Sequence, residues 1–263
     1  MTAHTGTRHR GGFTLTELLI VIAILGALLG LLLPGLGGVR QVAMDTACKS
    51  NLRGIGFAMI GYAGVNRGLY PPLADWRRWP TVYWWGVNDT PPDFTRGPLV
   101  NYLDHDAGVE GGLFECPAQP WGTYVPQGAT PGPTTTYGYN GYYLCPRATP
   151  GWAFSIGHRH WRTTESVKDP ARVFMVADTL MPWGGGVVSN NCLLDPPWTF
   201  SRGRWIENRF TTLCFRHMGR ANVCFADGHV ESVLPTRIID ADAMTGYVGE
   251  SNAPHYVPDW EDW

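Results

Sequence analysis

The residues whose types and spacing are best suited to acid–base or metal chemistry lie near the C-terminus, where His217 is followed after nine residues by Asp227 and Gly228. Histidine and aspartate can share a proton or a metal ion when their side chains come within about 3 Å of each other. Whether these two residues meet depends on the elements that carry them. Alternating apolar and polar residues predict three antiparallel strands at about 211–216, 221–226 and 229–234.

In such a meander, spanning residues 211–235, His217 and Asp227 lie at opposite ends of the middle strand. A strand of about six residues spans roughly 20 Å, so the two side chains would not form a dyad. We predict instead that Asp227 and Gly228 form a two-residue hairpin turn, because both positions favour positive φ. His217 would hold a nearby loop or contact another part of the chain.

Other residues of suitable chemistry lack a spacing that supports a site. Asp178 follows a predicted strand at 173–176. A metal ligand or an acid is one interpretation of this residue, but no partner spacing supports it, so a cap at the end of the strand is favoured. His158, His160 and His229 show no zinc-ligand spacing. The chain has no nucleophile elbow, phosphate loop or cofactor fingerprint. We therefore expect neither an enzyme nor a metal site.

The composition of the chain limits its function class. The 263 residues carry a formal net charge of −2, so no strong basic surface points to nucleic acid. There are 33 glycines and 21 prolines, which predict a loop-rich, β-leaning body with many turns. The aromatic content of 13% is too high for a largely disordered chain.

Six cysteines lie beyond residue 47, and an exported region would allow them to form disulfides. Cys116 and Cys145 are each followed by proline at the end of a short segment, and 111–118 is predicted to be a strand. These two cysteines are one candidate pair, although the sequence leaves every other pairing open. Free buried thiols are the alternative.

A tryptophan-rich segment at 64–98 contains Trp76, Trp79, Tyr83, Trp84 and Trp85. An aromatic platform for sugars or for a neighbouring protein is one interpretation. Packing in the core and in loops is the favoured one, because aromatic side chains bury large apolar areas.

The N-terminal region has the pattern of a membrane anchor. Residues 18–39 are a run of 22 without a charge, which as a helix would span about 33 Å. Arg8 and Arg10 precede this run and favour a cytoplasmic N-terminus. A cleaved signal peptide or a plain signal anchor would explain the length and the charges. Neither explains Glu17, since an unpaired carboxylate in hydrocarbon costs a few kcal/mol.

Apolar residues at spacings of three and four continue beyond the uncharged run, from Val39 to Tyr62. One helix over about 13–62 is therefore predicted, with a transmembrane half at 13–39 and an amphipathic half at 40–62. Pro34 and the glycines at 35–38 lie between the halves and predict a kink or local unwinding there in an assembled state.

The stretch from Gly11 to Glu17, followed by an apolar helix, resembles the prepilin signature of type IV pilins and type II secretion pseudopilins. The resemblance implies that a dedicated peptidase cuts after Gly12 and that Phe13 becomes an N-methylated first residue. Glu17 would then pair with the α-amine of Phe13 in a neighbouring subunit, which explains a buried charge. Pro34 matches a proline common in pilin helices.

The spacing of His217 from Asp227 and Gly228 resembles the His-x9-Asp-Gly motif of a planctomycete-type prepilin-like family with large C-terminal bodies. Shorter matches to this family are scattered over the chain, and residues 64–110 and 180–210 are not covered. The matches are Cys48, Asn51-Leu52 with Arg53, Cys116-Pro117, 137–140 and Ala177-Asp178. Some related pseudopilins bind calcium, and Asp240 and Asp242 are candidate calcium ligands here. They do not form a complete ligand loop, so the absence of a cofactor is the favoured prediction and calcium is the alternative.

Together these features predict an α+β protein with a leader at 1–12, an N-terminal helix at 13–62 and a β-rich exported head at 63–263. The resemblance implies a structural subunit of a pilus or secretion pseudopilus, held in the inner membrane with a cytoplasmic N-terminus before assembly into a periplasmic or extracellular filament. Its partners would be other pilin subunits, the prepilin peptidase and an inner-membrane assembly platform. The alternative is a minor pilin or anchored adhesin whose tryptophan-rich head binds a glycan or protein.

Overall fold

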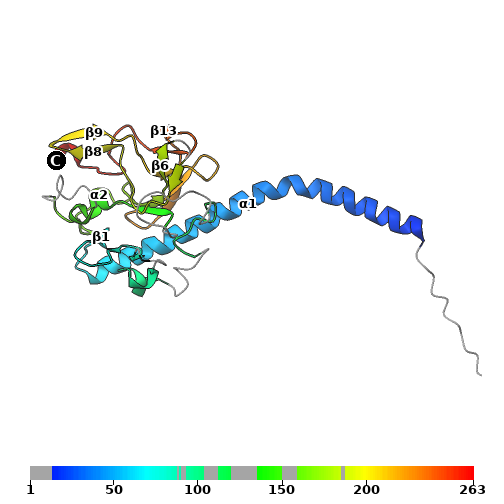
Figure 1. Cartoon of the computed structure of the whole chain (residues 1–263), viewed down its shortest axis with the longest axis horizontal. Helices are drawn as coiled ribbons and strands as arrows, with labels where there is room; N and C mark the ends of the chain where they lie inside the picture. Colours follow the sequence, from blue (N-terminus) through cyan, green and yellow to red (C-terminus); the bar gives the residue numbers. More distant parts are fainter. Residues whose placement is uncertain are drawn as a thin grey trace, which may run out of the picture. The chain divides into compact units, whose positions relative to one another are not determined.

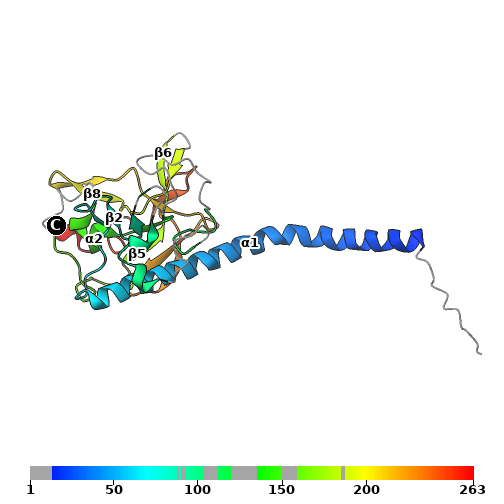
Figure 2. The ribbon, with the colours of Figure 1, turned by 60° about the horizontal axis from the view of Figure 1, so that its bottom comes forward.

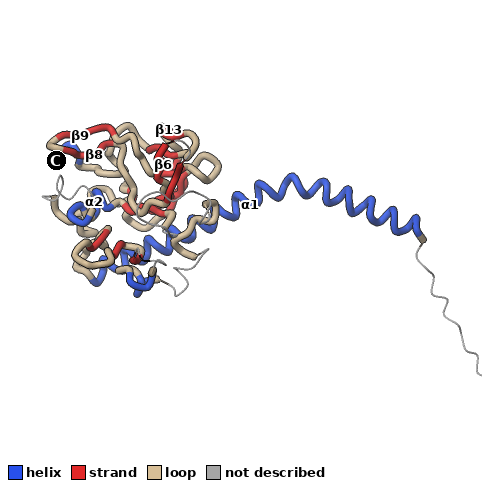
Figure 3. Tube along the Cα trace, viewed as in Figure 1, coloured by secondary structure: helices blue, strands red, loops and turns tan. Residues whose placement is uncertain are grey.

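A computed structural model of the chain describes residues 14–87, 89, 93–103, 112–119, 135–149, 159–184 and 187–263; within helix α1, the side chains of 29 and 31–36 are not described. The order of elements is a long helix followed by short strands and brief helical turns, which confirms the predicted α+β class. Much of the head is loop between these short elements (Figure 3). The chain divides into two compact units, Met1–Val42 and Ala43–Trp263.

Helix α1 spans Leu15–Val65 and crosses the boundary between the two units. In its last part, residues at spacings of three and four are fully buried in the core of the head, as the amphipathic pattern predicts. Figure 2 shows this part of α1 running along the base of the head. The buried residues are Cys48, Leu52, Ile55, Ala58, Met59 and Ala63.

The central sheet of the head, which lies beyond the last part of α1 in Figure 1, has four antiparallel strands in the order β12-β11-β5-β4. Its two middle strands, β5 and β11, are buried along their whole length. The bounds are β4 Tyr137–Tyr139, β5 Phe174–Asp178, β11 Ala221–Phe225 and β12 Val230–Val233.

Smaller sheets and hairpins surround this centre. A three-stranded sheet contains β1 Ala74–Asp75, β2 Val82–Tyr83 and β3 Gly86–Val87, and another contains β10 Leu213–Cys214, β14 Thr245–Tyr247 and β13 Arg237–Asp240. The hairpins are β6 Met181–Gly184 with β7 Val187–Ser189, and β8 Trp198–Ser201 with β9 Arg204–Glu207. The short helices are α2 Gly141–Leu144, η1 Phe94–Arg96, η2 Val100–Tyr102, η3 Pro146–Ala148 and η4 Trp260–Asp262.

Two features of the predicted C-terminal meander have different outcomes. The hairpin of β11 and β12 is present, but its turn is longer than the predicted two residues. The Phe225 N–H donates to the His229 carbonyl oxygen across three residues, and of Asp227 and Gly228 only Gly228 has a positive φ, of +93°. The position of the first predicted strand, at 211–216, is wrong, because β11 pairs on its other edge with β5, and β10 pairs with β14 instead. The predicted strand at 111–118 is also absent from its described part, 112–119, which forms turns and bends.

Candidate functional site

The first turn of α1 is closed by a reciprocal contact between Thr14 and Glu17. The Glu17 carboxylate accepts hydrogen bonds from the Thr14 backbone N–H at 2.8 Å and from its hydroxyl at 2.7 Å. The Glu17 N–H donates to the Thr14 hydroxyl oxygen at 3.3 Å. This is a capping box, in which the side chains satisfy backbone donors that have no partner in the helix. The pattern Thr-x-x-Glu was visible in the sequence, but only an intersubunit role was assigned to Glu17.

The other predicted processing and assembly residues cannot be placed in the same detail. Gly12 and Phe13 lie outside the described residues, and Pro34 lies within the bounds of α1 among side chains that the structure does not describe. The described apolar side chains from Leu15 to Leu28 are 44% to 78% exposed. Over the part of the chain that is described, no helix combines the length and apolar character needed to cross a membrane.

A second site lies inside the head, where four chemically reactive side chains meet. Cys48 comes from α1, Cys116 from a turn, Asp178 from the end of β5, and His217 from the turn before β11. One potential ligand atom from each residue lies within 4.8 Å of all the others. All four residues are buried, with at most 4% of any one exposed. We call these four residues the CCDH cluster.

The contacts within the CCDH cluster are short. The Sγ of Cys48 is 3.3 Å from Oδ1 of Asp178, and the Sγ of Cys116 is 3.3 Å from Nε2 of His217. The same Nε2 of His217 is 3.3 Å from Oδ2 of Asp178. The four side chains thus point at one common point from different elements of the head.

Local structure explains how each element delivers its side chain. His217 begins a tight turn, in which its backbone N–H and C=O both bond to Arg220 and the two residues between have positive φ. Cys116 is fixed because its N–H donates to the Thr136 hydroxyl at 2.7 Å. Asn51, one turn after Cys48 on α1, donates to the carbonyl oxygen of Glu115 at 3.0 Å and so ties the Cys116 turn to the helix.

A further layer of polar groups orients the cluster. The N–H of Asn222 donates to Oδ2 of Asp178 at 2.9 Å, and its side-chain amide donates to Asp45 at 2.8 Å. Asp45 also faces Nδ1 of His217 at 3.7 Å, on the side of the ring away from the cluster. The Tyr137 hydroxyl donates to Cys48 Sγ at 3.5 Å. Two residues of the scattered family pattern, Cys48 and Tyr137, therefore touch.

The pKa values of the cluster residues are set by opposite charges that interact in a buried environment of low dielectric constant. Burial by itself would raise the pKa of Asp178, but the hydrogen bond from His217 and the positive charge of Arg216 outweigh it and lower the pKa. Burial would lower the pKa of His217, whereas its hydrogen bonds to Asp178 and Cys116 raise it to about 10. Burial disfavours the Cys116 thiolate, yet the hydrogen bonds from Cys48 and His217 bring its pKa down to about 6.

The structure extends the predictions about these residues. The favoured interpretation of Asp178 is a strand-end cap, and it does accept a backbone hydrogen bond, but it also contacts Cys48 and His217 from far along the chain. Of the two roles predicted for His217, contact with another part of the chain is the one observed, with Cys116 and Asp178. Asp227 does have a local role, because its Oδ1 accepts the N–H of His229 at 3.1 Å and contacts Nδ1 of its ring at 2.5 Å.

The candidate disulfide between Cys116 and Cys145 is not present, and both thiols are free and buried. Cys116 belongs to the CCDH cluster, whereas the Cys145 sulfur accepts a hydrogen bond from the N–H of Leu73 at 3.2 Å. Of the predicted calcium candidates, Asp240 accepts the N–H of Ala243 at 2.8 Å, which is a contact within its own turn.

The tryptophan-rich segment does not present its rings together. Trp84 and Trp85 are buried in the core, where the Trp84 indole N–H donates to the carbonyl oxygen of Cys192 at 2.9 Å. Trp76 and Trp79 are 51% and 95% exposed. The packing interpretation therefore holds for the two central rings of the segment.

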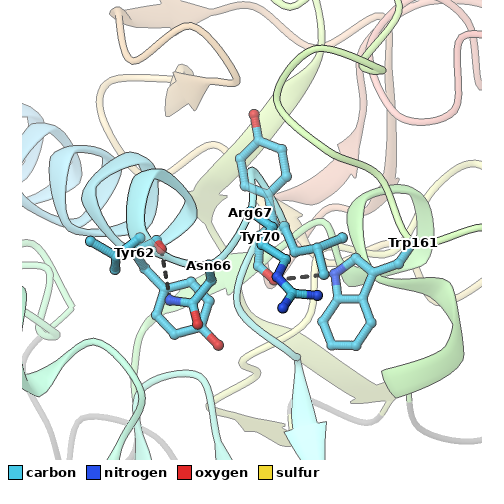
Figure 4. A pocket seen from close by; sticks show the side chains of 7 residues that line it. Tyr62, Asn66, Arg67, Tyr70 and Trp161 are labelled. Atoms are coloured by element: carbon cyan, nitrogen blue, oxygen red, sulfur yellow. Dashed lines mark hydrogen bonds between the residues drawn. The ribbon is translucent and has the colours of Figure 1, made fainter.

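A shallow surface pocket of about 260 Å³ lies where α1 ends (Figure 4). Two of its polar side chains donate hydrogen bonds to the backbone nearby. Asn66 donates to the carbonyl oxygen of Tyr62 at 2.8 Å, and the Trp161 indole donates to that of Tyr70 at 3.1 Å. The pocket lining contains Arg67 but no carboxylate, thiol or imidazole, so it offers little for acid–base or metal chemistry.

Comparison with known families adds one finding at the N-terminus. Residues 7–33 match the family described as the prokaryotic N-terminal methylation motif. This match supports a type IV pilin-like precursor, of the kind that is processed by a prepilin peptidase and assembles with other pilin subunits. No curated protein and no solved structure matches the chain. The matched segment contains Gly12, Phe13 and Glu17, and the CCDH cluster lies wholly outside it.

Proposed function

We propose that this chain is the precursor of a structural subunit of a type IV pilus or a type II secretion pseudopilus. The observation that carries the proposal is the methylation motif at 7–33, which runs directly into α1. The peptidase would cut after Gly12 and methylate the new N-terminus at Phe13. The subunit would leave the inner membrane through an assembly platform and act in a filament outside it, without enzymatic activity.

The two parts of α1 support different tasks in this proposal. The exposed apolar residues of the first part would pack laterally against the same helix of other subunits, away from water. The last part is buried against the head and would carry it outward on the filament. The burial of Trp84 and Trp85 removes two rings from the aromatic surface that an adhesin would need, so we favour the structural role.

The capping box allows a sharp test of the charge of Glu17. Glutamine can close the same capping box as glutamate, whereas alanine cannot. We expect Glu17→Gln to keep the start of α1 but to lose filament assembly, because the neighbour's α-amine then has no carboxylate partner. Glu17→Ala should lose both. Normal filament formation by Glu17→Gln, scored by shearing and electron microscopy, would contradict the proposed pairing.

Processing can be measured independently by intact mass spectrometry of the protein from its own cells. We expect a mature chain that begins at N-methylated Phe13. The matched control is Gly12→Asp, which should retain the leader and accumulate in the membrane fraction. A mature chain that begins near Gly38 would instead indicate ordinary signal-peptide cleavage, and the proposal would fail.

A further inference from the structure

The CCDH cluster has no task in filament assembly as proposed, yet it gathers buried groups that are costly to hide. A buried carboxylate and imidazole need partners, and each additional partner must be supplied by the fold. Cys48 and Asp178 are 130 residues apart in sequence, and Cys116 and His217 are 101 apart. The convergence of four such side chains on one point suits a bound metal ion or a covalent bond between two of the side chains.

Three separations within the CCDH cluster match those between the ligands of a tetrahedral metal site. Zinc lies about 2.3 Å from thiolate sulfur and about 2.0–2.2 Å from imidazole nitrogen or carboxylate oxygen, and it prefers four ligands. Two ligands at those lengths and a tetrahedral angle lie roughly 3.3–3.8 Å apart. Oδ2 of Asp178 is 3.6 Å from the Cys48 sulfur and 3.3 Å from Nε2 of His217, which is itself 3.3 Å from the Cys116 sulfur. The ligand atoms of all four residues lie within 4.8 Å of one another.

We propose that Cys48, Cys116, Asp178 and His217 form a structural zinc site that ties the exported head to helix α1. Two sulfur ligands, one imidazole and one carboxylate suit Zn²⁺ better than the harder Mg²⁺ or Ca²⁺, which prefer oxygen. The site is closed, because all four ligands come from the protein and all are buried. A closed site of this kind stabilises a fold and leaves no position for a substrate.

The surroundings of the cluster are those that metal-bound ligands require. The outer ring nitrogen of a zinc-bound histidine usually faces a carboxylate or carbonyl, and Nδ1 of His217 faces Asp45. Asp178 is held by the N–H of Asn222, and the Cys48 sulfur by the Tyr137 hydroxyl. With both thiols ionised, the ligands carry three negative charges, which Zn²⁺ and the nearby Arg216 together balance.

A disulfide between Cys48 and Cys116 is the main competitor, since the head would be exported to an oxidising compartment. A disulfide would account for the two sulfurs but not for the carboxylate and the imidazole aimed at them. Disulfide sulfur is at best a weak hydrogen-bond acceptor, so Asp178 and His217 would lose their contacts with ionisable thiols. Zinc uses all four groups at once.

The test is the metal content of the full chain, purified in detergent under reducing conditions without a histidine tag. We expect one zinc per chain by inductively coupled plasma mass spectrometry. Replacement of zinc by cobalt(II) should give the visible absorption of a tetrahedral site and a sulfur-to-cobalt charge-transfer band. A chain that takes up neither metal would overturn the proposal, and this measurement on the unaltered sequence needs no variant to fold.

Variants then assign the ligands. Cys116→Ser should reduce the charge-transfer band to about half, and Asp178→Asn should lower zinc affinity by at least about tenfold. The matched control is Cys224→Ser, which removes another buried thiol and should retain one zinc per chain. Loss of zinc in this control as well, or a Cys48–Cys116 disulfide found by peptide mapping of the protein from its own cells, would overturn the assignment.

Discussion

At Gly56, α1 lies directly against the central sheet, and adding one methyl group there should be costly. A Cβ at this position would lie well inside van der Waals contact of the Cys224 sulfur on β11, and 3.5 Å from Cε of Met175 on β5. Overpacking of this kind costs about 1–3 kcal/mol. The gain in helix propensity from glycine to alanine offsets about 1 kcal/mol. We therefore expect Gly56→Ala to lower the free energy of unfolding by up to about 2 kcal/mol, which is the difference between these two estimates.

Gly64 provides the matched control on the same helix. Nothing lies within 4 Å of a Cβ built there, so Gly64→Ala should keep only the propensity gain, up to about 1 kcal/mol. The assay is urea unfolding of the full chain in detergent, followed by tryptophan fluorescence.

Removing the Cys224 sulfur tests whether the loss of stability in Gly56→Ala comes from a steric clash with that sulfur. In a Cys224→Ala background, Gly56→Ala should keep only the propensity gain expected at Gly64, so the double-mutant cycle should show a coupling equal to the steric cost, about 1–3 kcal/mol. The reasoning would be refuted if Gly56→Ala were as stable as Gly64→Ala. It would also be refuted if the effects of Gly56→Ala and Cys224→Ala simply added.

Two further predictions concern single aspartates. Burial raises the pKa of Asp195 to about 8, so between about pH 4 and pH 8 the folded state binds more protons than the unfolded state and stability falls as pH rises. Asp195→Asn should flatten this slope and stabilise the protein at pH 8, and an unchanged slope in thermal unfolding would count against it. Asp227→Ala removes the acceptor for His229 and should lower the free energy of unfolding by about 0.5–1.5 kcal/mol per lost hydrogen bond. Asp227→Asn should lower it less, and equal losses of stability for the two variants in urea unfolding would argue against this role.

Patterns within short segments were the part of the fold that could be predicted from the sequence. The stripe from Cys48 to Met59 predicted the buried face of α1, and Asp227 with Gly228 predicted the hairpin of β11 and β12. Both depend on local periodicity or on turn chemistry. The meander failed because strand neighbours need not follow one another in sequence, and β5, about forty residues before β11, occupies the edge expected for the preceding strand.

The two candidate sites also differ in whether a short segment of sequence is enough to predict them. The residues predicted for processing and assembly, Gly12, Phe13 and Glu17, lie in one short stretch of sequence, inside the segment 7–33 that matches the N-terminal methylation motif. The CCDH cluster has no such spacing, because each ligand comes from a different element and only the tertiary fold brings them together. The scattered family matches named three of its four residues, Cys48, Cys116 and Asp178, and the His-x9-Asp-Gly motif supplied His217. What the sequence lacked was evidence that these blocks meet.

The distribution of the cluster along the chain also affects the order in which the head can form. Strand β5 is flanked in the sheet by β4, which precedes it, and by β11, which follows it. The cluster joins residues that are 130 and 101 positions apart in the sequence. Closing loops of this length is slow compared with forming a helix, because chain entropy must be lost before the contact is gained. Because Cys48 precedes His217 in the sequence, it leaves the ribosome first. Its thiol has no imidazole partner until His217 has also been synthesised. A chain shortened to end before residue 217 would contain Cys48, Cys116 and Asp178 but not His217, so only a chain synthesised into its last fifth can complete the cluster.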